Sequence, residues 1–277
     1  MLNIIIGKSS NLSIELEKKL ENTLLVSSLE IIDVFNKIEF NKYNKINIIF
    51  NQFQQATRLY DLSTPFDYIN RSIASTSLVL DYILLNNLSI NKIIYTSSSS
   101  VYGNNISCNE DDKLQPLSIH SSLKISNEKL IELFCTQYNI NYTITRVFNM
   151  YGKDDKFSII SKIINTFSSD SVLSLINNGE ALRDYIYIGD VVYAYAKILK
   201  VNNYSIVNIG TSNGTSIKSI LDYLKRNSII VNVKNIKNVK TELKKSISQN
   251  IKLKEILDEY EFKRVESYIL TKLKDIK

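Results

Sequence analysis

Short apolar runs alternate with amphipathic stretches through the first half of the chain. Five runs have the length and β-branched character of strands: Leu2–Ile6, Leu24–Val26, Ile46–Phe50, Ile93–Thr96 and Tyr142–Val147. Apolar residues recur at helical spacing in Leu12–Leu20, Ala74–Leu88 and Ser121–Tyr138, and in the last of these we expect Glu128, Lys129 and Glu132 to face solvent. Alternating strands and helices imply right-handed crossovers, so the pattern predicts an α/β fold with a doubly wound parallel sheet.

The second half is less regular. Helices are expected at Phe157–Phe167, Val191–Leu199 and Ser216–Leu224, and extended segments at Tyr185–Ile188, Ile206–Ile209 and Ile229–Val233, before a lysine-rich loop and one or two terminal helices. No Pro-, Gly- or Ser-rich linker is present, so a second domain should interleave with the first. We expect a first domain over 1–155 and a second region over 156–277, part of 185–210 returning to the core sheet.

Composition narrows the possible partners. One histidine and two cysteines do not make a metal site or a disulfide framework. The net charge of +6 is concentrated after residue 217, where 15 basic and 8 acidic side chains alternate with apolar ones at helical spacing. This pattern favours a solvated helix face over a nucleic-acid site, although part of the charge could attract a phosphorylated small molecule. With no signal peptide or membrane-length apolar run, we expect a soluble cytoplasmic protein.

The turn after the first strand is where a dinucleotide fold places phosphate-binding glycines. Gly7 is present, but Ser10 and Ser13 stand at the other two positions of a Gly-x-x-Gly-x-x-Gly spacing. Serine keeps the backbone N–H groups and adds a hydroxyl donor, so phosphate binding is weakened and not excluded; a plain strand–turn–helix is the alternative. The second strand ends in Ser27 and Ser28, with Glu30 and Asp33 beyond, which leaves the choice between NAD and NADP open.

A second group of candidate residues follows the fourth predicted strand. Ser97 to Ser100 would place hydroxyls at the carboxyl edge of a parallel sheet, where such folds bind ligands. His120 and Lys124 are spaced i, i+4 on the next predicted helix, so they share one face. A hydroxyl loop, an imidazole and an ammonium facing one cleft indicate proton-transfer chemistry.

Five motifs follow one another along the chain: SSSSVYG, PLSIHSSLKISNE, RVFNMYG, RDYIYIGDVV and NIGT. In order and spacing they resemble those of the extended short-chain dehydrogenase/reductases, the NAD-dependent epimerase/dehydratase group that acts on nucleotide sugars. That family has Ser-Ser-x-x-Val-Tyr-Gly, Pro-x-Ser-x-Tyr-x-x-x-Lys with a later Glu, Arg-x-Phe-Asn-x-Tyr-Gly, Arg-Asp-Phe-Ile-x-Val-x-Asp-Val and Asn-Ile-Gly. The resemblance spans nearly the whole length and implies a Rossmann-like fold.

The resemblance also implies roles for individual residues. Ser98 stands where the family's catalytic hydroxyl binds the sugar oxygen, and Lys124 where its lysine binds the nicotinamide ribose. Asn149 and Arg183 match contacts to the sugar nucleotide, although Asn149 could simply cap a turn and Arg183 could form a surface ion pair. Ser99, beside Ser98, is a further candidate contact to the substrate.

Departures from the family pattern concern the chemistry. His120 replaces the tyrosine that exchanges a proton with the sugar oxygen, and Ser121 replaces the glycine after it. Ser99 and Ser100 replace the Asp-Glu pair of the dehydratases, which disfavours 4,6-dehydration because no acid is available for the leaving hydroxyl. Gln52 and Phe53 replace two alanines and could intrude on the cofactor's pyrophosphate.

Together the motifs imply an NAD- or NADP-dependent nucleotide-sugar oxidoreductase, a 4-ketoreductase or an epimerase, in sugar or surface-polysaccharide precursor synthesis. Its partners would be a nucleotide-sugar substrate and a second copy of the chain in a homodimer, with no nucleic acid and no membrane. The alternative is a degenerate relative that binds a nucleotide, a nucleotide sugar or a partner chain without turnover.

Overall fold

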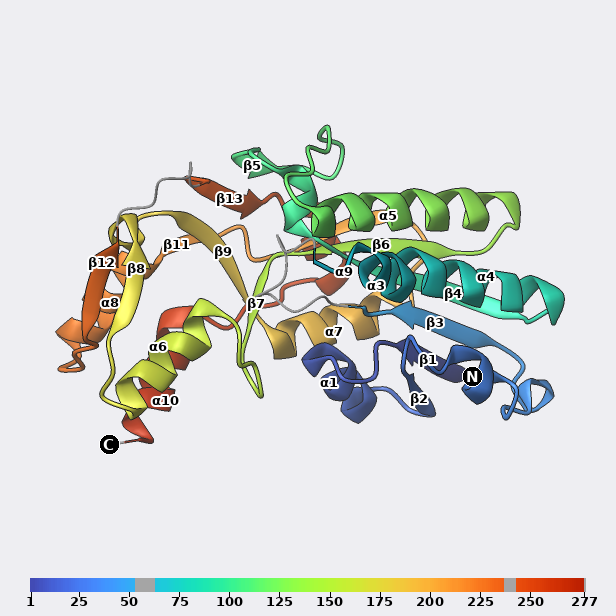
Figure 1. Cartoon of the computed structure of the whole chain (residues 1–277), viewed down its shortest axis with the longest axis horizontal. Coiled ribbons are helices and arrows are strands. Elements are labelled where there is room, and N and C mark those ends of the chain that lie inside the picture. The colour runs from blue at the N-terminus through green and yellow to red at the C-terminus, as the bar shows by residue number, and fades with distance from the viewer. Residues whose placement is uncertain (53–62, 237–242, 277) are drawn as a thin grey trace. The chain divides into compact units, whose positions relative to one another are not determined.

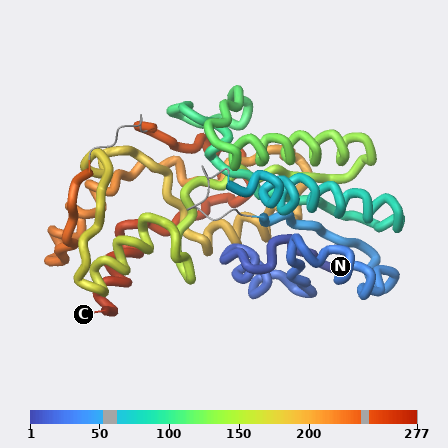
Figure 2. Tube along the Cα trace, viewed as in Figure 1, coloured from blue at the N-terminus to red at the C-terminus, as the bar shows by residue number. Residues whose placement is uncertain are grey.

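A computed structural model of the chain describes residues 1–52, 63–236 and 243–276. The chain divides into two compact units. The first comprises Met1–Gly103, Lys113–Arg146 and Val192–Val207. The second comprises Asn104–Asp112, Val147–Val191 and Asn208–Lys277. Figure 2 shows the late segment of the first unit, coloured yellow to orange, among the blue and green elements that precede it.

A six-stranded sheet in the order β10-β6-β4-β3-β1-β2 forms the centre of the first unit. Its strands are β1 (Leu2–Ile6), β2 (Thr23–Val26), β3 (Ile46–Phe50), β4 (Ile90–Ser98), β6 (Tyr142–Val147) and β10 (Ile206–Ile209). The pairs β1–β2, β1–β3 and β3–β4 are parallel. All five residues of β1 and of β3 are buried, as expected for a sheet covered on both faces. The predicted doubly wound α/β fold is therefore confirmed.

Helices cover both faces of this sheet. They are α1 (Asn11–Lys19), α2 (Ile31–Phe35), α3 (Pro65–Ile69), α4 (Ser75–Leu85), α5 (Ile119–Gln137) and α7 (Ile188–Ile198). Two short 3-10 helices, η1 (Phe40–Lys42) and η4 (Ser99–Tyr102), and a π-helical segment between α3 and α4, η3 (Asn70–Ala74), complete the set. Figure 1 shows α4 and α5 on one face and α1 and α7 on the other. The larger apolar core lies under α2, α4 and α5, against β1, β3 and β4.

The strand order creates a switch point beside β1. The chain runs from β1 outward to β2 and then returns to β3 on the other side of β1. In open parallel sheets, ligands bind in the crevice outside the carboxyl ends of the strands at such a point. Gly7 follows β1 there and Asn51 follows β3. The fold thus places the predicted dinucleotide turn at the edge where ligands bind.

The second unit has smaller sheets and its own apolar core. Its strands are β5 (Ser107–Cys108), β7 (Asn149–Tyr151), β8 (Leu173–Ile176), β9 (Leu182–Tyr187), β11 (Gly214–Ser216), β12 (Val233–Ile236) and β13 (Lys245–Ser248). Its helical elements are α6 (Ile159–Ser168), α8 (Ile217–Arg226), α9 (Ile251–Leu257), α10 (Val265–Lys274) and the short turn η5 (Asn177–Gly179). One sheet has the order β11-β9-β13-β5 with β7 on β9, and β12 pairs with β8. The core packs α6, α8 and α10 together.

Two expectations about the second half differ from the structure. The strand expected at Ile229–Val233 lies at Val233–Ile236, where it pairs with β8. Ile229 is buried in the core of the unit, but its N–H bonds to Leu224 O and closes α8, so this apolar stretch is irregular. Ile188, expected as extended, is the first residue of α7.

The division into units also differs from the expected domain boundaries. The first unit ends its second segment at Arg146 instead of residue 155, because β7 pairs with β9 of the second unit. Residues 104–112 belong to the second unit because β5 pairs with β13. Val192–Val207 also belongs to the first unit. Among the described residues, no helix is long and apolar enough to cross a bilayer.

Candidate active site

The turn between β1 and α1 requires a glycine at position 7. Gly7 has a φ of +118°, and a Cβ atom there would lie 2.2 Å from Asn51 O. Such a φ and such an approach exclude other residues. The Gly7 N–H donates to Val26 O at 2.8 Å, and α1 begins at Asn11 after the N-cap residue Ser10. The strand–turn–helix geometry of a dinucleotide turn is therefore present.

The two serines of this turn are held by Asn51. Asn51 Nδ2 donates to Ser10 Oγ at 3.1 Å and to Ser13 Oγ at 2.8 Å. Ser13 Oγ donates to Gly7 O at 2.7 Å, and Ser10 Oγ accepts from Ser13 N at 3.4 Å. The hydroxyl donor that we expected from Ser13 for a phosphate is therefore used inside the turn. The network replaces the close glycine packing of the family pattern.

The residues of this edge fit a dinucleotide. The first turn of α1 has the backbone N–H groups that bind phosphate at a helix N-terminus. Asn51 Oδ1 is buried without a hydrogen-bond partner among the described residues, so a ligand hydroxyl such as that of ribose would satisfy it. The side chain of Gln52 donates from Nε2 to Ser75 Oγ at 2.6 Å, at the start of α4. Phe53 lies outside the described residues.

The serine loop continues directly from β4. Ser98 is the last residue of β4 and the N-cap of η4, and its Oγ accepts from Ser100 N at 3.2 Å. Ser98 and Ser99 are half-buried. Ser97 is fully buried, and its hydroxyl donates to the carboxylate of Glu128. The loop thus places hydroxyls at the carboxyl edge of the sheet, with Ser97 anchored below them.

His120 and Lys124 lie in the first two turns of α5. Ser118 caps this helix: its Oγ accepts from Ser121 N at 3.2 Å, and Ser121 Oγ in turn accepts from Ser118 N at 3.1 Å. Serine at 121, where the family has glycine, therefore completes a capping box. His120 is 7% exposed and Lys124 is 4% exposed, so both side chains point into the protein.

Lys124 spans the ends of two strands. Its Nζ donates to Thr96 O at 2.6 Å, near the end of β4, and to Gln52 O at 2.8 Å, just after β3. It also lies 5.0 Å from the centre of the Tyr95 ring. The ammonium is therefore held at the carboxyl edge, where the resemblance places the family lysine.

Burial controls the charge of both side chains. Desolvation and the nearby charge of Lys124 lower the pKa of His120 to about 3. Desolvation lowers the pKa of Lys124 to about 7, although the charge of Glu128 acts in the opposite direction. Around neutral pH the imidazole is therefore uncharged, and small changes in its surroundings can change the charge of the lysine.

The lowered pKa of His120 predicts that the folded chain loses stability in acid. Between the ordinary value of 6.5 and about 3, the unfolded chain binds a proton that folded His120 does not. Unfolding is therefore favoured as pH falls, by up to about 1.4 kcal/mol per pH unit. Urea unfolding at a series of pH values should show this slope, and His120→Phe should flatten it. Parallel curves for the two proteins would contradict the assignment.

Glu128 was expected to face solvent and does not. It is 4% exposed and pairs with buried Arg146, whose Nη2 lies 2.8 Å from Oε2. Arg146 Nη1 also donates to Tyr102 OH at 3.0 Å, and its guanidinium lies over the Tyr102 ring. Glu128 follows Lys124 by four residues, so the same helical spacing places it on the helix face that carries His120 and Lys124. The network fixes both ends of the serine loop to α5 and β6.

The two predicted sugar-nucleotide contacts belong to the second unit. Asn149 is on β7, opposite Tyr185, and its Nδ2 donates to Asp184 O at 3.1 Å. Arg183 is on the paired strand β9, and its Nη1 donates to Leu182 O at 2.9 Å. Both side chains are half-buried. The structure places them on neighbouring strands of one sheet, and their substrate roles stay predictions.

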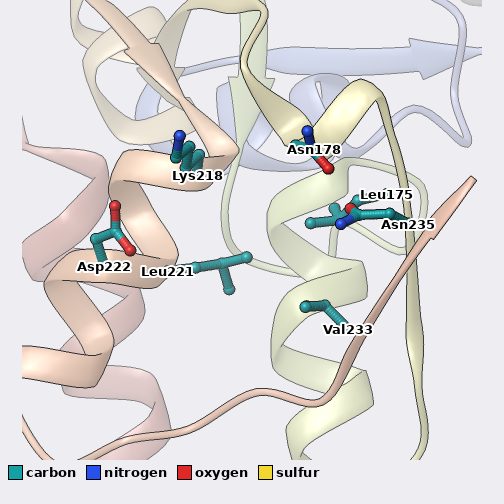
Figure 3. A pocket seen from close by; sticks show the side chains of 7 residues that line it. All are labelled: Leu175, Asn178, Lys218, Leu221, Asp222, Val233 and Asn235. Atoms are coloured by element: carbon teal, nitrogen blue, oxygen red, sulfur yellow. The ribbon is translucent and has the colours of Figure 1, made fainter.

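A pocket of about 320 Å³ lies elsewhere in the second unit. Figure 3 shows Lys218, Leu221 and Asp222 of α8 facing side chains of β8 and β12 across it. Lys218 forms an exposed ion pair with Glu180 at 3.3 Å. The pocket contains none of the predicted site residues. No metal-binding group of three or more His, Cys, Asp or Glu occurs in the part of the chain that the structure describes.

Comparison with known proteins identifies the family. The model of the NAD dependent epimerase/dehydratase family matches residues 8–210. A putative UDP-glucose 4-epimerase of Methanocaldococcus jannaschii is 30% identical over 200 residues, which cover 70% of this chain and 64% of that protein. Protein CapI of Staphylococcus aureus is 29% identical over 179 residues, which cover 60% and 53%. The chain spans about a third to two thirds of the length of the curated relatives that it matches.

Solved structures share the fold over the whole chain. UDP-glucuronic acid 4-epimerase from Bacillus cereus, in complex with UDP-glucuronic acid and NAD, has a TM-score of 0.79 at 19% identity, covering 100% of this chain and 99% of that one. UDP-glucose 4-epimerase from Thermotoga maritima, in complex with UDP-glucose, has a TM-score of 0.82 at 20% identity, covering 99% and 98%. With the family model matched over most of its length, this chain belongs to the NAD dependent epimerase/dehydratase family.

Proposed function

We propose that the chain is a nicotinamide-dependent nucleotide-sugar oxidoreductase, acting as a 4-epimerase or a 4-ketoreductase. The observation that carries the proposal is the buried Lys124 ammonium at the carboxyl edge of the sheet, with His120 one helical turn before it. The family membership and the UDP-sugar epimerases among the relatives support it. Binding of NADH or NADPH and turnover of a UDP-sugar test the proposal.

The dinucleotide would lie between the Gly7 turn and Lys124, and when bound it supplies a hydride acceptor or donor for sugar C4. The first turn of α1 would hold its phosphates through backbone N–H groups. Lys124 would bind the nicotinamide ribose and keep a positive charge near the reacting oxygen. This charge favours an alkoxide at the sugar oxygen over an alcohol.

His120 and Ser98 would handle the proton of the sugar oxygen. A neutral imidazole has one N–H donor and one lone pair, so it can bind an alcohol or a carbonyl oxygen. Because the imidazolium is strongly disfavoured, His120 would act as a relay: one ring nitrogen takes the proton from the alcohol while the other ring nitrogen releases its own proton to water. Ser98, on the adjoining loop, would add a hydroxyl donor to the same oxygen. Ser99 and Ser100 supply no acid, so we propose that elimination of a sugar hydroxyl is not the reaction.

A relative that binds nucleotides without turnover is the second candidate. Two observations favour it: the low pKa of His120, which makes it a weak base, and the network by which Asn51 ties up the serines of the turn. Such a protein would bind a UDP-sugar but leave both it and NADH or NADPH unchanged. Turnover above the uncatalysed rate excludes this candidate.

We also propose that the chain forms a homodimer and acts in the cytoplasm, in the synthesis of precursors for surface polysaccharides. The exposed leucines of two neighbouring helices support the dimer: Leu78 and Leu85 on α4 and Leu133 on α5. A second copy could cover these exposed apolar side chains. A monomeric mass by light scattering at micromolar concentration would contradict it.

A further inference from the structure

The end of β2 is joined to the turn after β1. β1 and β2 are parallel, with Ile6 opposite Val26. Two consecutive N–H groups, of Gly7 and Lys8, donate to Val26 O at 2.8 Å and 3.2 Å. Lys8 is therefore held next to the residues that follow Val26. In dinucleotide folds this is the place of the adenosine ribose.

No carboxylate directly follows β2 to hold the ribose 2′-hydroxyl. Ser27 and Ser28, both half-buried, follow β2 directly, where an acidic residue would accept the hydrogen bond from that hydroxyl. Ser27 Oγ accepts from Leu29 N at 3.3 Å, and Ser27 O accepts from Glu30 N at 3.1 Å. These bonds form a tight turn that leaves the Ser27 hydroxyl hydrogen available as a donor.

Lys8 is the charged residue whose backbone is hydrogen-bonded to the end of β2. Its side chain is exposed, and it forms no ion pair with any described residue. The nearest acids in sequence, Glu30 and Asp33, come later, at the start of α2, and both are exposed. A phosphate monoester carries between one and two negative charges at neutral pH and has only acceptor oxygens around its ester bond. Hydroxyl donors and a lysine ammonium can therefore bind such a phosphate, whereas a carboxylate would repel it.

We propose that the end of β2 binds the 2′-phosphate of the adenosine ribose, so that the chain prefers NADP(H) to NAD(H). Lys8 supplies the charge, and Ser27 and Ser28 supply hydroxyl donors. The inference deepens the proposed function and rests on dinucleotide binding at the Gly7 turn. It assigns this chain a cofactor different from the NAD bound by its solved relatives.

Adenosine 2′,5′-bisphosphate and AMP test this directly, because they differ only in the 2′-phosphate and contain no nicotinamide. Titration calorimetry on the full chain should show that the bisphosphate binds at least about 10-fold more tightly than AMP. The preference should fall as salt is added. Lys8→Ala should remove most of the preference for the bisphosphate, whereas Lys19→Ala, on the exposed end of α1, should change neither affinity. Ser27→Asp should reverse the preference.

Three results would overturn the inference. Equal binding of the two nucleotides, with NADH bound as tightly as NADPH, refutes the 2′-phosphate site and leaves the proposed function intact. Selective loss of AMP and NADH binding in Glu30→Gln would assign the ribose hydroxyls to Glu30 and imply NAD. If none of the four nucleotides binds the folded chain, both the inference and dinucleotide binding are wrong.

Discussion

Replacing His120 by alanine should lower kcat by about 10²- to 10⁴-fold, the usual contribution of a positioned proton carrier. The neutral imidazole beside Lys124 has one N–H donor and one lone pair, so it can bind the sugar oxygen and relay its proton. Alanine leaves the buried lysine in place, so dinucleotide binding should persist while turnover is lost. His120→Tyr restores the family's proton carrier and should keep or raise turnover, because a phenol reaches farther than an imidazole.

The control for this prediction lies on the same helix. Ser126 is exposed on α5 and bonds only to the carbonyl of Ser122 among the described contacts, so Ser126→Ala should not change kcat. Steady-state rates with a UDP-sugar, together with NADPH fluorescence for binding, separate chemistry from folding. Unchanged turnover in His120→Ala would show that His120 is not the proton carrier.

Replacing Arg146 by methionine should destabilise the chain by about 3–5 kcal/mol. The guanidinium pairs with Glu128 through three contacts at 2.8–3.2 Å from two nitrogens, Nε and Nη2, and both side chains are buried. Methionine fills a similar volume but leaves the Glu128 carboxylate buried without a cation. We therefore expect the melting temperature to fall by roughly 10 °C. The serine loop that depends on Glu128 and Tyr102 should also become more mobile.

An exposed ion pair on the same helix is the matched comparison. Lys129 and Glu132 lie 3.1 Å apart with both side chains in solvent, so Lys129→Met should change stability by less than about 1 kcal/mol. Adding Glu128→Gln to Arg146→Met should recover part of the loss, since it removes the uncompensated charge. Denaturant unfolding measures all four proteins. A loss below about 1 kcal/mol in Arg146→Met would show that the buried pair is not important for stability.

The sequence predicted the first unit well because its strands are buried on both faces. Apolar runs such as Ile46–Phe50 and Tyr142–Val147 match β3 and β6 residue for residue, since no exposed face breaks the pattern. The second unit has short strands with one face exposed, such as β8, whose burial alternates, and these do not stand out from loops. The strand expected at Ile229–Val233 was placed too early in the chain. The residues buried in the core there, such as Ile229, are not the residues that pair with β8.

The residues of the candidate site could be predicted from the sequence, but most of their hydrogen-bond partners could not. Spacing alone places His120 and Lys124 on one face of a helix. The partners of these residues are long-range: Glu128 meets Arg146 across 18 positions, and Asn51 meets Ser13 across 38. Treating Glu128 as a solvated charge was wrong, because a buried arginine from another strand compensates it. Asn51 is a polar residue directly after a buried strand, and this position could have indicated that its side chain bonds to the turn.

Binding of a reduced nicotinamide dinucleotide to the full chain tests the proposed function most directly. NADH or NADPH fluorescence should change saturably on adding the protein. Lys124→Met, which removes the ammonium between Thr96 O and Gln52 O, should weaken this binding without unfolding the chain. Absence of binding for both dinucleotides at millimolar concentration, with the protein folded, would contradict the proposed function.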